Sequence, residues 1–321
     1  MKKTVLCVLA SSAALLAAMG LAFLWCCPEV KWQAAMLGAH RAFWRQLCWN
    51  AVGIAAFCTM LRFGWRRTLR AAPFVVVGWV AMLLVAEFFC PMVNGELYFW
   101  HKSVGVGVKV MALLPLVAAL ALAWVSDRFK IKAHRLLLLM VAATLLVMVG
   151  RIATNANRVE RIKAFFRGDA PPAVAMYPSS MASCWAQKTC VDAVRASRWF
   201  SGDEGYLRNN PIPGRLTFAM PAAASLTFGR WFLVLAGAGF AALLWCFVRA
   251  FRTTTDYGKR VFLVVAGLGV FVPAIQSTCE CLCLTPMLYT CVPLVSSDGT
   301  LSLATWTAIG VFAAMAENDH V

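Results

Sequence analysis

Long apolar stretches alternate with short basic stretches along most of the chain. A helix needs roughly 20 apolar residues to cross a bilayer, because lipid offers no partner to its backbone polar groups. The pattern predicts about eight such spans, and they are 4–26, 46–61, 72–90, 104–125, 136–150, 231–248, 261–279 and 301–316. The sequence therefore predicts an all-α polytopic membrane protein. The first stretch also begins as a signal peptide does, but Trp25 stands where a processing site requires a small residue.

The spacing of these stretches divides the chain into three parts. An N-terminal bundle of about five helices is expected at 1–150, a large outward loop with an interfacial helix at 151–229, and a C-terminal bundle of about three helices at 230–321.

Basic residues predict the orientation, because they concentrate on the cytoplasmic side of a membrane protein. They flank or follow the first, second, fourth and sixth stretches, as Lys2, Lys3, Arg62, Arg66, Arg67, Arg70, Arg128, Lys130, Lys132, Arg135, Arg249, Arg252, Lys259 and Arg260. Both termini are then cytoplasmic and 151–229 faces outward. A re-entrant segment at 136–157 would instead leave that loop inside.

The composition and charge fit a membrane protein and exclude an ordinary soluble one. Hydrophobic residues make up 61% of 321 residues and charged residues only 14%, and the mean hydropathy is +0.72. The net charge of +16 is explained by topology and by anionic membrane lipid, so no nucleic-acid partner is predicted. The outward loop carries more basic than acidic residues, which suits either an anionic substrate or headgroup, or simple solvation.

Cysteine and histidine give no sign of a metal site. The 13 cysteines lie within spans or near their outer ends, and the 4 histidines are scattered without ligand spacing. Cys184 and Cys190 are the most plausible local disulfide couple in an oxidising compartment. The sequence also lacks a phosphate-binding glycine loop. We therefore predict no cofactor, and a divalent cation is the one alternative kept open.

Six sequence elements, in order, resemble those of the SEDS family, the FtsW-, RodA- and SpoVE-like proteins of cell division and cell shape. They are FWRQLCW with RFGWRRTLRAAP (43–49 and 62–73), VNG (93–95), the segment 104–128 in place of a PSExxK helix, NRVERIKAFF (157–166), the segment 195–219, and Gln276, Pro293, Ser296 and Gly299 within 276–310. The chain resembles a shortened, divergent member, with two of the family's ten spans missing between about 136 and 157.

This resemblance implies a SEDS-like helical bundle in the bacterial inner membrane, with the large loop in the periplasm. It implies peptidoglycan glycosyltransferase activity on lipid II, or on a related undecaprenyl-pyrophosphate-linked glycan. It also implies a class B penicillin-binding protein, a transpeptidase, as the partner.

The resemblance makes the catalytic residue uncertain. It places Phe218 at the position of the family's catalytic aspartate, and no acid occurs from Gly205 to Arg230. Asp203 and Glu204 lie upstream in the same loop and are the candidates for a displaced general base, with solvated loop acids as the alternative. The family's PSExxK glutamate corresponds to Val106, while Lys109 stands where its lysine would be.

The candidate substrate-binding residues are Arg158, Arg161, Lys109, Ser296 and Gly299. Arg158 and Arg161 are one helical turn apart and could hold guanidinium groups at pyrophosphate depth, unless they belong to a plain amphipathic connector. Lys109 is a charge among apolar residues near a span end, which marks either a functional interior position or a lysine that snorkels to the interface. Ser296 and Gly299 otherwise form, with Asp298, a tight turn between helices.

Three functions therefore stay open. They are a lipid II polymerase with a relocated base, a catalytically silent scaffold of the division or elongation machinery, and a ligase or exporter of another polyprenyl-linked glycan. The missing aspartate favours the scaffold on chemical grounds, and the family elements argue against the third function.

Overall fold

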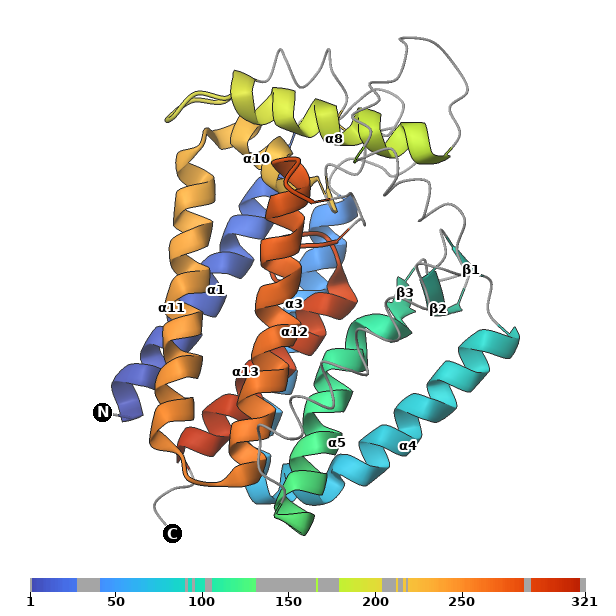
Figure 1. The fold of residues 1–321 in the computed structure, drawn as a ribbon, viewed down its shortest axis with the longest axis vertical. Coiled ribbons are helices and arrows are strands. Elements are labelled where there is room, and N and C mark those ends of the chain that lie inside the picture. The colour runs from blue at the N-terminus through green and yellow to red at the C-terminus, as the bar shows by residue number, and fades with distance from the viewer. Residues whose placement is uncertain are drawn as a thin grey trace.

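The computed structural model describes residues 2–27, 41–89, 92–93, 96–101, 106–130, 166, 179–203, 212, 216–217, 219–285 and 290–317. Figure 1 shows long helices that run side by side, a helix that lies across one end of them, and a small antiparallel sheet near the same end.

The helices in chain order are α1 (Lys2–Cys26), α3 (Arg41–Phe63), α4 (Trp65–Phe89), α5 (Leu114–Phe129), α8 (Ser179–Ala196), α10 (Met220–Phe228), α11 (Trp231–Thr253), α12 (Tyr257–Cys281) and α13 (Gly299–Glu317). Among the described residues, six helical segments are long and apolar enough to cross a membrane, and they are Lys3–Cys26, Trp65–Phe88, Val110–Phe129, Trp231–Thr253, Tyr257–Cys281 and Gly299–Ala316. The prediction of an all-α polytopic membrane protein is therefore confirmed.

Local sequence explains where several helices begin and end. Gly64, with φ of 77°, separates α3 from α4, and its N–H donates to the carbonyl of Met60. A left-handed residue of this kind ends a helix, and glycine adopts that conformation without a steric penalty. At the start of α12, the carboxylate of Asp256 accepts from the N–H of Lys259 and caps the helix.

The sheet joins α4 to α5. Its strands are β1 (Met92–Val93), β2 (Glu96–His101) and β3 (Val106–Lys109), paired antiparallel in that order. A short 3₁₀ helix, η1 (Val110–Leu113), then leads into α5. The expected span at 104–125 was therefore wrong at its start, because Val106–Lys109 pairs as a strand and the membrane-length helical segment begins only at Val110.

Helix α13 forms the centre of the bundle. Within its span, 78% of the residues are buried, against 17% for α4, which lies at an outer edge in Figure 1. Helix α13 contacts α1, α3, α4, α5 and α12. A buried helix at the centre needs small or apolar residues on every side, and 301–316 is made of such residues, with Ser302, Thr305 and Thr307 as its polar members.

The other expected spans and the expected outward loop can be compared with the observed helices. The expected spans near 4–26, 72–90, 231–248, 261–279 and 301–316 coincide with α1, α4, α11, α12 and α13, and α4 ends at Phe89. The expected span at 46–61 lies within α3, which is not among the six candidate spans of the described residues. The expected span at 136–150 lies outside the described residues. Within 151–229, α8 lies across one end of the bundle, and α10 is buried from Met220 to Leu226, so this helix belongs to the protein core.

Basic residues gather at the opposite end of the bundle. Helix α1 begins there, the α3–α4 and α11–α12 junctions lie there, and α5 ends there (Figure 1). This is the arrangement that the distribution of cations in the sequence predicts. We refer below to this end as the basic end and to the α8 side as the α8 end.

Candidate functional site

A charged pair lies at the point where β3 passes into the span of α5. The Nζ atom of Lys109 is 3.0 Å from Oδ2 of Asp298, and the two side chains are 22% and 6% exposed. A charged group at this depth loses most of its hydration, so it is retained only when it has a partner or a function. The pair joins two segments far apart in the sequence and is the centre of the candidate site.

Backbone contacts fix the position of Lys109. Its N–H donates to Oγ1 of Thr300 in α13, at 3.0 Å. The next residue, Val110, is fully buried, and its carbonyl accepts from Nε1 of Trp79 in α4, also at 3.0 Å. The lysine is therefore held between α4 and α13 rather than left on a flexible loop.

Asp298 has two roles at the start of α13. Its Oδ1 accepts from the N–H of Leu301, which caps the helix, while Oδ2 faces Lys109. The carboxylate also lies at the positive end of the α13 dipole, which favours a negative charge there. One side chain thus fixes both the central helix and the lysine.

Ser296 and Gly299 flank Asp298, and the structure gives both of them packing roles. The hydroxyl of Ser296 donates to the carbonyl of Val292 at 2.8 Å, within the same turn. A Cβ atom at Gly299 would lie only 1.9 Å from Cδ1 of Trp49 in α3. Glycine is therefore required at this close approach, and the tight-turn interpretation accounts for both residues.

A buried polar seam joins α3 to α13 beside this turn. Nε2 of Gln46 donates to Oγ of Ser302 at 2.7 Å, and Nε1 of Trp306 donates to Oδ1 of Asn50 at 3.0 Å. Gln46 is fully buried and Asn50 is 3% exposed. Interhelical hydrogen bonds of this kind hold membrane helices together. The seam was missed as a feature of the site, although two polar residues at i and i+4 in an apolar span signal it.

The backbone links this turn to the segment in which the family resemblance places the catalytic aspartate. The N–H of Ser297 donates to the carbonyl of Leu216 at 2.9 Å, and the hydroxyl of Ser297 is buried without a hydrogen-bond partner. Phe218 itself lies outside the described residues, but Leu216 is two positions before it. Asp298 therefore follows a residue that pairs directly with this segment.

Among the other predicted site residues, only Asp203 is described. Its side chain is exposed, and its N–H donates to the carbonyl of Leu226 in α10 at 2.7 Å. Glu204, Arg158 and Arg161 lie outside the described residues. The structure thus brings together Lys109, Ser296 and Gly299, and it adds Asp298 as the partner of the lysine.

A second buried acid lies at the end of α12. Glu280 is fully buried, and its Oε1 accepts from Nε2 of Gln276 at 3.1 Å and from Oγ1 of Thr290 at 2.8 Å. Its backbone carbonyl accepts from Nε2 of Gln187 in α8. A carboxylate with several donors can stay charged inside a protein. The cluster ties α8 and the segment near Thr290 to α12, and sequence reasoning missed Glu280.

The same contact between α8 and α12 brings two thiols together. The pKa of Cys190 lies well above its ordinary value because its thiol hydrogen-bonds to Cys281, because it is buried, and because Glu280 is nearby. Neither cysteine belongs to a disulfide in the described part of the chain. Among the described residues, the neighbour of the Cys190 thiol is therefore Cys281. The side chain of Cys184, which sequence spacing favoured as a disulfide partner, lies outside the described residues. No group of three or more metal-ligating side chains occurs in the described part of the chain.

Comparison with known proteins gives no match to a family model or to a curated protein. Solved structures do match. One is a chain reported under "Structural coordination of polymerization and crosslinking by a peptidoglycan synthase complex", with a TM-score of 0.68, 14% identity and coverage of 97% of each chain. The rod shape determining protein RodA of Thermus thermophilus matches with a TM-score of 0.62 and 16% identity. Its aspartate-to-alanine mutant matches with a TM-score of 0.65 and 17% identity, and both RodA matches cover 98% of this chain and 97% of RodA.

At identities this low the matches show a shared fold and nothing about function. The shared fold extends over nearly the whole length of both chains. The chain is an integral membrane protein with the fold of RodA, as its resemblance to the SEDS family predicts.

Proposed function

We propose that this chain acts in peptidoglycan synthesis in the bacterial inner membrane, where it binds lipid II or a related undecaprenyl-pyrophosphate-linked glycan. The observation that carries the proposal is the Lys109–Asp298 pair, held at the start of a span within a RodA fold. Ser297 and the turn before α13 complete the site.

The chemistry of the site suits such a substrate. An ammonium group in weakly hydrated surroundings stabilises the oxygens of a pyrophosphate more strongly than it would in water. Lys109 lies at the end of its span away from the basic end. If the basic end is cytoplasmic, the site faces the periplasm, where a lipid-linked glycan would be polymerised.

Glycan transfer also needs a base that removes a proton from the attacking sugar hydroxyl. We propose Asp298 for this role, because its neighbour Ser297 pairs with Leu216, close to the position where the family aspartate is replaced by Phe218. The alternatives are a base at Asp203 or Glu204, and a silent scaffold that binds the precursor without turnover. The observation in support of the scaffold is that both carboxylate oxygens of Asp298 already have partners within the protein.

The test is polymerisation of labelled lipid II by the purified protein in liposomes, with binding measured in parallel. Both measurements are made with and without a class B penicillin-binding protein, the proposed partner. Asp298→Asn removes the charge and keeps an oxygen that can cap α13. Asp127→Asn is the matched control, because Asp127 pairs with Lys130 at 3.2 Å in an exposed pair at the basic end.

Polymer made by the wild type and by Asp127→Asn, but not by Asp298→Asn, would support Asp298 as the base. Loss of polymer only in the Asp203→Ala/Glu204→Ala variant would place the base in the loop instead. Absence of polymer from every form, with lipid II binding that Lys109→Met weakens, would establish the scaffold. Absence of lipid II binding by the folded wild type would refute the proposal.

A further inference from the structure

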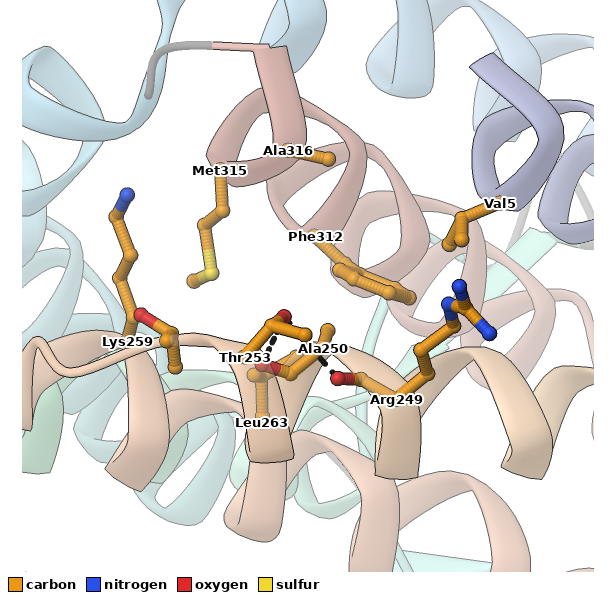
Figure 2. Close-up of a pocket in the computed structure, with 10 residues that line it drawn as sticks. Val5, Arg249, Ala250, Thr253, Lys259, Leu263, Phe312, Met315 and Ala316 are labelled. Carbon is orange, nitrogen blue, oxygen red and sulfur yellow. Dashed lines mark hydrogen bonds between the residues drawn. The ribbon is translucent and has the colours of Figure 1, made fainter. Parts of the chain in front are cut away.

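A cavity of about 170 Å³ lies at the basic end of the bundle, far from the Lys109–Asp298 site. A water molecule needs only about 10–15 Å³ of such space, so the cavity has room for a much larger group. Figure 2 shows that its walls come from the beginning of α1, the end of α11, the beginning of α12 and the end of α13. All four helices include candidate spans, and the cavity lies where the ends of these spans meet.

The walls of the cavity are of two kinds. Arg249 and Lys259 supply two positive charges, and no acidic side chain belongs to the described residues that line it. Val5, Phe312 and Met315 supply an apolar surface next to these charges. A phospholipid combines the same two features, an anionic phosphate and the beginning of an acyl chain.

Arg249 provides a second, independent observation. Its guanidinium carbon lies 5.1 Å from the centre of the Trp245 ring, one turn earlier in α11. Its Nε is buried and has no hydrogen-bond partner among the described residues. Stacking on an aromatic ring uses the face of the guanidinium and leaves its N–H groups to point outward in the plane. A buried donor without an acceptor is costly, and a phosphate oxygen in the cavity would remove that cost.

Trp245 connects the cavity to the membrane. Its side chain is 44% exposed on the surface of α11, a helix that is a candidate span. Tryptophan is enriched at the level of lipid headgroups because its ring is apolar and its N–H is polar. The ring and the arginine together therefore place a cation and an interfacial aromatic side chain beside the apolar wall of the cavity.

We propose that this cavity binds the phosphate of an anionic phospholipid from the leaflet at the basic end, with the first part of an acyl chain against Phe312 and Met315. The lipid would join the end of α13 to the α11–α12 junction. The site does not depend on the proposed function, because it lies at the other end of the molecule.

The test measures binding of fluorescent phosphatidylglycerol to the purified full-length protein in detergent, with unlabelled phosphatidylglycerol, phosphatidylcholine and inorganic phosphate as competitors. The test variant is Arg249→Gln. The matched control is Arg252→Gln, which removes the same charge from the last turn of α11 at an exposed position that does not line the cavity. Arg249→Lys retains the charge, and the thermal unfolding of each variant without added lipid shows whether it folds.

We expect Arg249→Gln to weaken phosphatidylglycerol binding by at least about tenfold, since the lost interaction is a charge-assisted hydrogen bond in a partly buried site. Arg252→Gln is expected to change it by about twofold or less, as a screened surface charge does, and Arg249→Lys to restore part of the affinity. Equal effects of Arg249→Gln and Arg252→Gln would refute a discrete site. Competition by inorganic phosphate as strong as that by unlabelled phosphatidylglycerol would refute the lipid as its occupant.

Discussion

The contact between α1 and the turn before α13 gives a sharp test of the packing around the candidate site. Gly20 in α1 is buried against the backbone of the turn, and a Cβ atom there would lie 2.4 Å from the carbonyl oxygen of Val295. Backbone atoms cannot rotate away as a side chain can. Small residues at helix contacts are how membrane helices approach this closely.

The magnitude of a Gly20→Ala effect can be worked out from this geometry. Ordinary contact begins at 3.4 Å, so the turn or the helix must move by about 1 Å, the difference between 3.4 and 2.4 Å. Overpacking of this kind typically costs about 1–3 kcal/mol. Replacing glycine by alanine in a helix also stabilises it by up to about 1 kcal/mol, so this gain must be subtracted.

Gly237→Ala measures the stabilisation that alanine gives relative to glycine in a helix, without the steric conflict. Gly237 lies in α11, and a Cβ atom there would meet nothing within 4 Å. We expect Gly237→Ala to be neutral or stabilising and Gly20→Ala to be less stable than it by about 1–3 kcal/mol. The free energy of unfolding is measured by denaturant titration in one detergent.

The same variants give a functional measurement. Val295 is three residues before Asp298, so a shift of the turn displaces the carboxylate from Lys109. Gly20→Ala should weaken lipid II binding, while Gly237→Ala should not. Free energies for the two variants that agree within about 0.5 kcal/mol would mean that the close contact between α1 and the turn is absent, and would refute the reasoning.

Three further predictions concern other parts of the bundle. Cys190, with its raised pKa and buried thiol, should be alkylated by iodoacetamide at mildly alkaline pH much more slowly than the exposed Cys283, as peptide mass spectrometry would show. Trp306→Phe removes the donor to Asn50 and should destabilise the bundle by about 1–2 kcal/mol, with an unchanged unfolding midpoint as the contrary result. Asp256→Ala removes the cap of α12 and should cost about 1 kcal/mol, whereas Asp256→Asn should cost little; equal losses would contradict the capping role.

The sequence was sufficient for six of the eight expected spans, because an apolar stretch of membrane length has few alternatives in lipid. It also marked Lys109, because a charge among apolar residues stands out. It did not identify Asp298 as the partner, since an acid after Ser296 and Ser297 is equally typical of a turn, and only the fold brings position 298 to position 109. The strand at Val106–Lys109 was overlooked although valine and glycine alternate there, because the apolar total favoured a helix.

The polar residues illustrate the same limit. Gln46 and Asn50 are visible as polar positions four residues apart, but their partners Ser302 and Trp306 lie 256 residues away in both cases. The pattern of residues along a helix shows which of its faces carries polar side chains. It does not show which other segment packs against that face. Glu280 was missed for a related reason, because its donors Gln187 and Thr290 come from segments outside its own helix.

This separation has a consequence for how the protein is made. When α3 leaves the ribosome and enters the membrane, the residues that will satisfy Gln46 and Asn50 have not yet been synthesised. The most buried candidate span among the described residues, that of α13, is also made after all the helices that it contacts. Until α13 inserts, the helices that will contact it have an uncovered surface, and the side chains of Gln46 and Asn50 lack their final partners. We therefore expect the growing chain to be most vulnerable to aggregation and proteolysis just before α13 inserts.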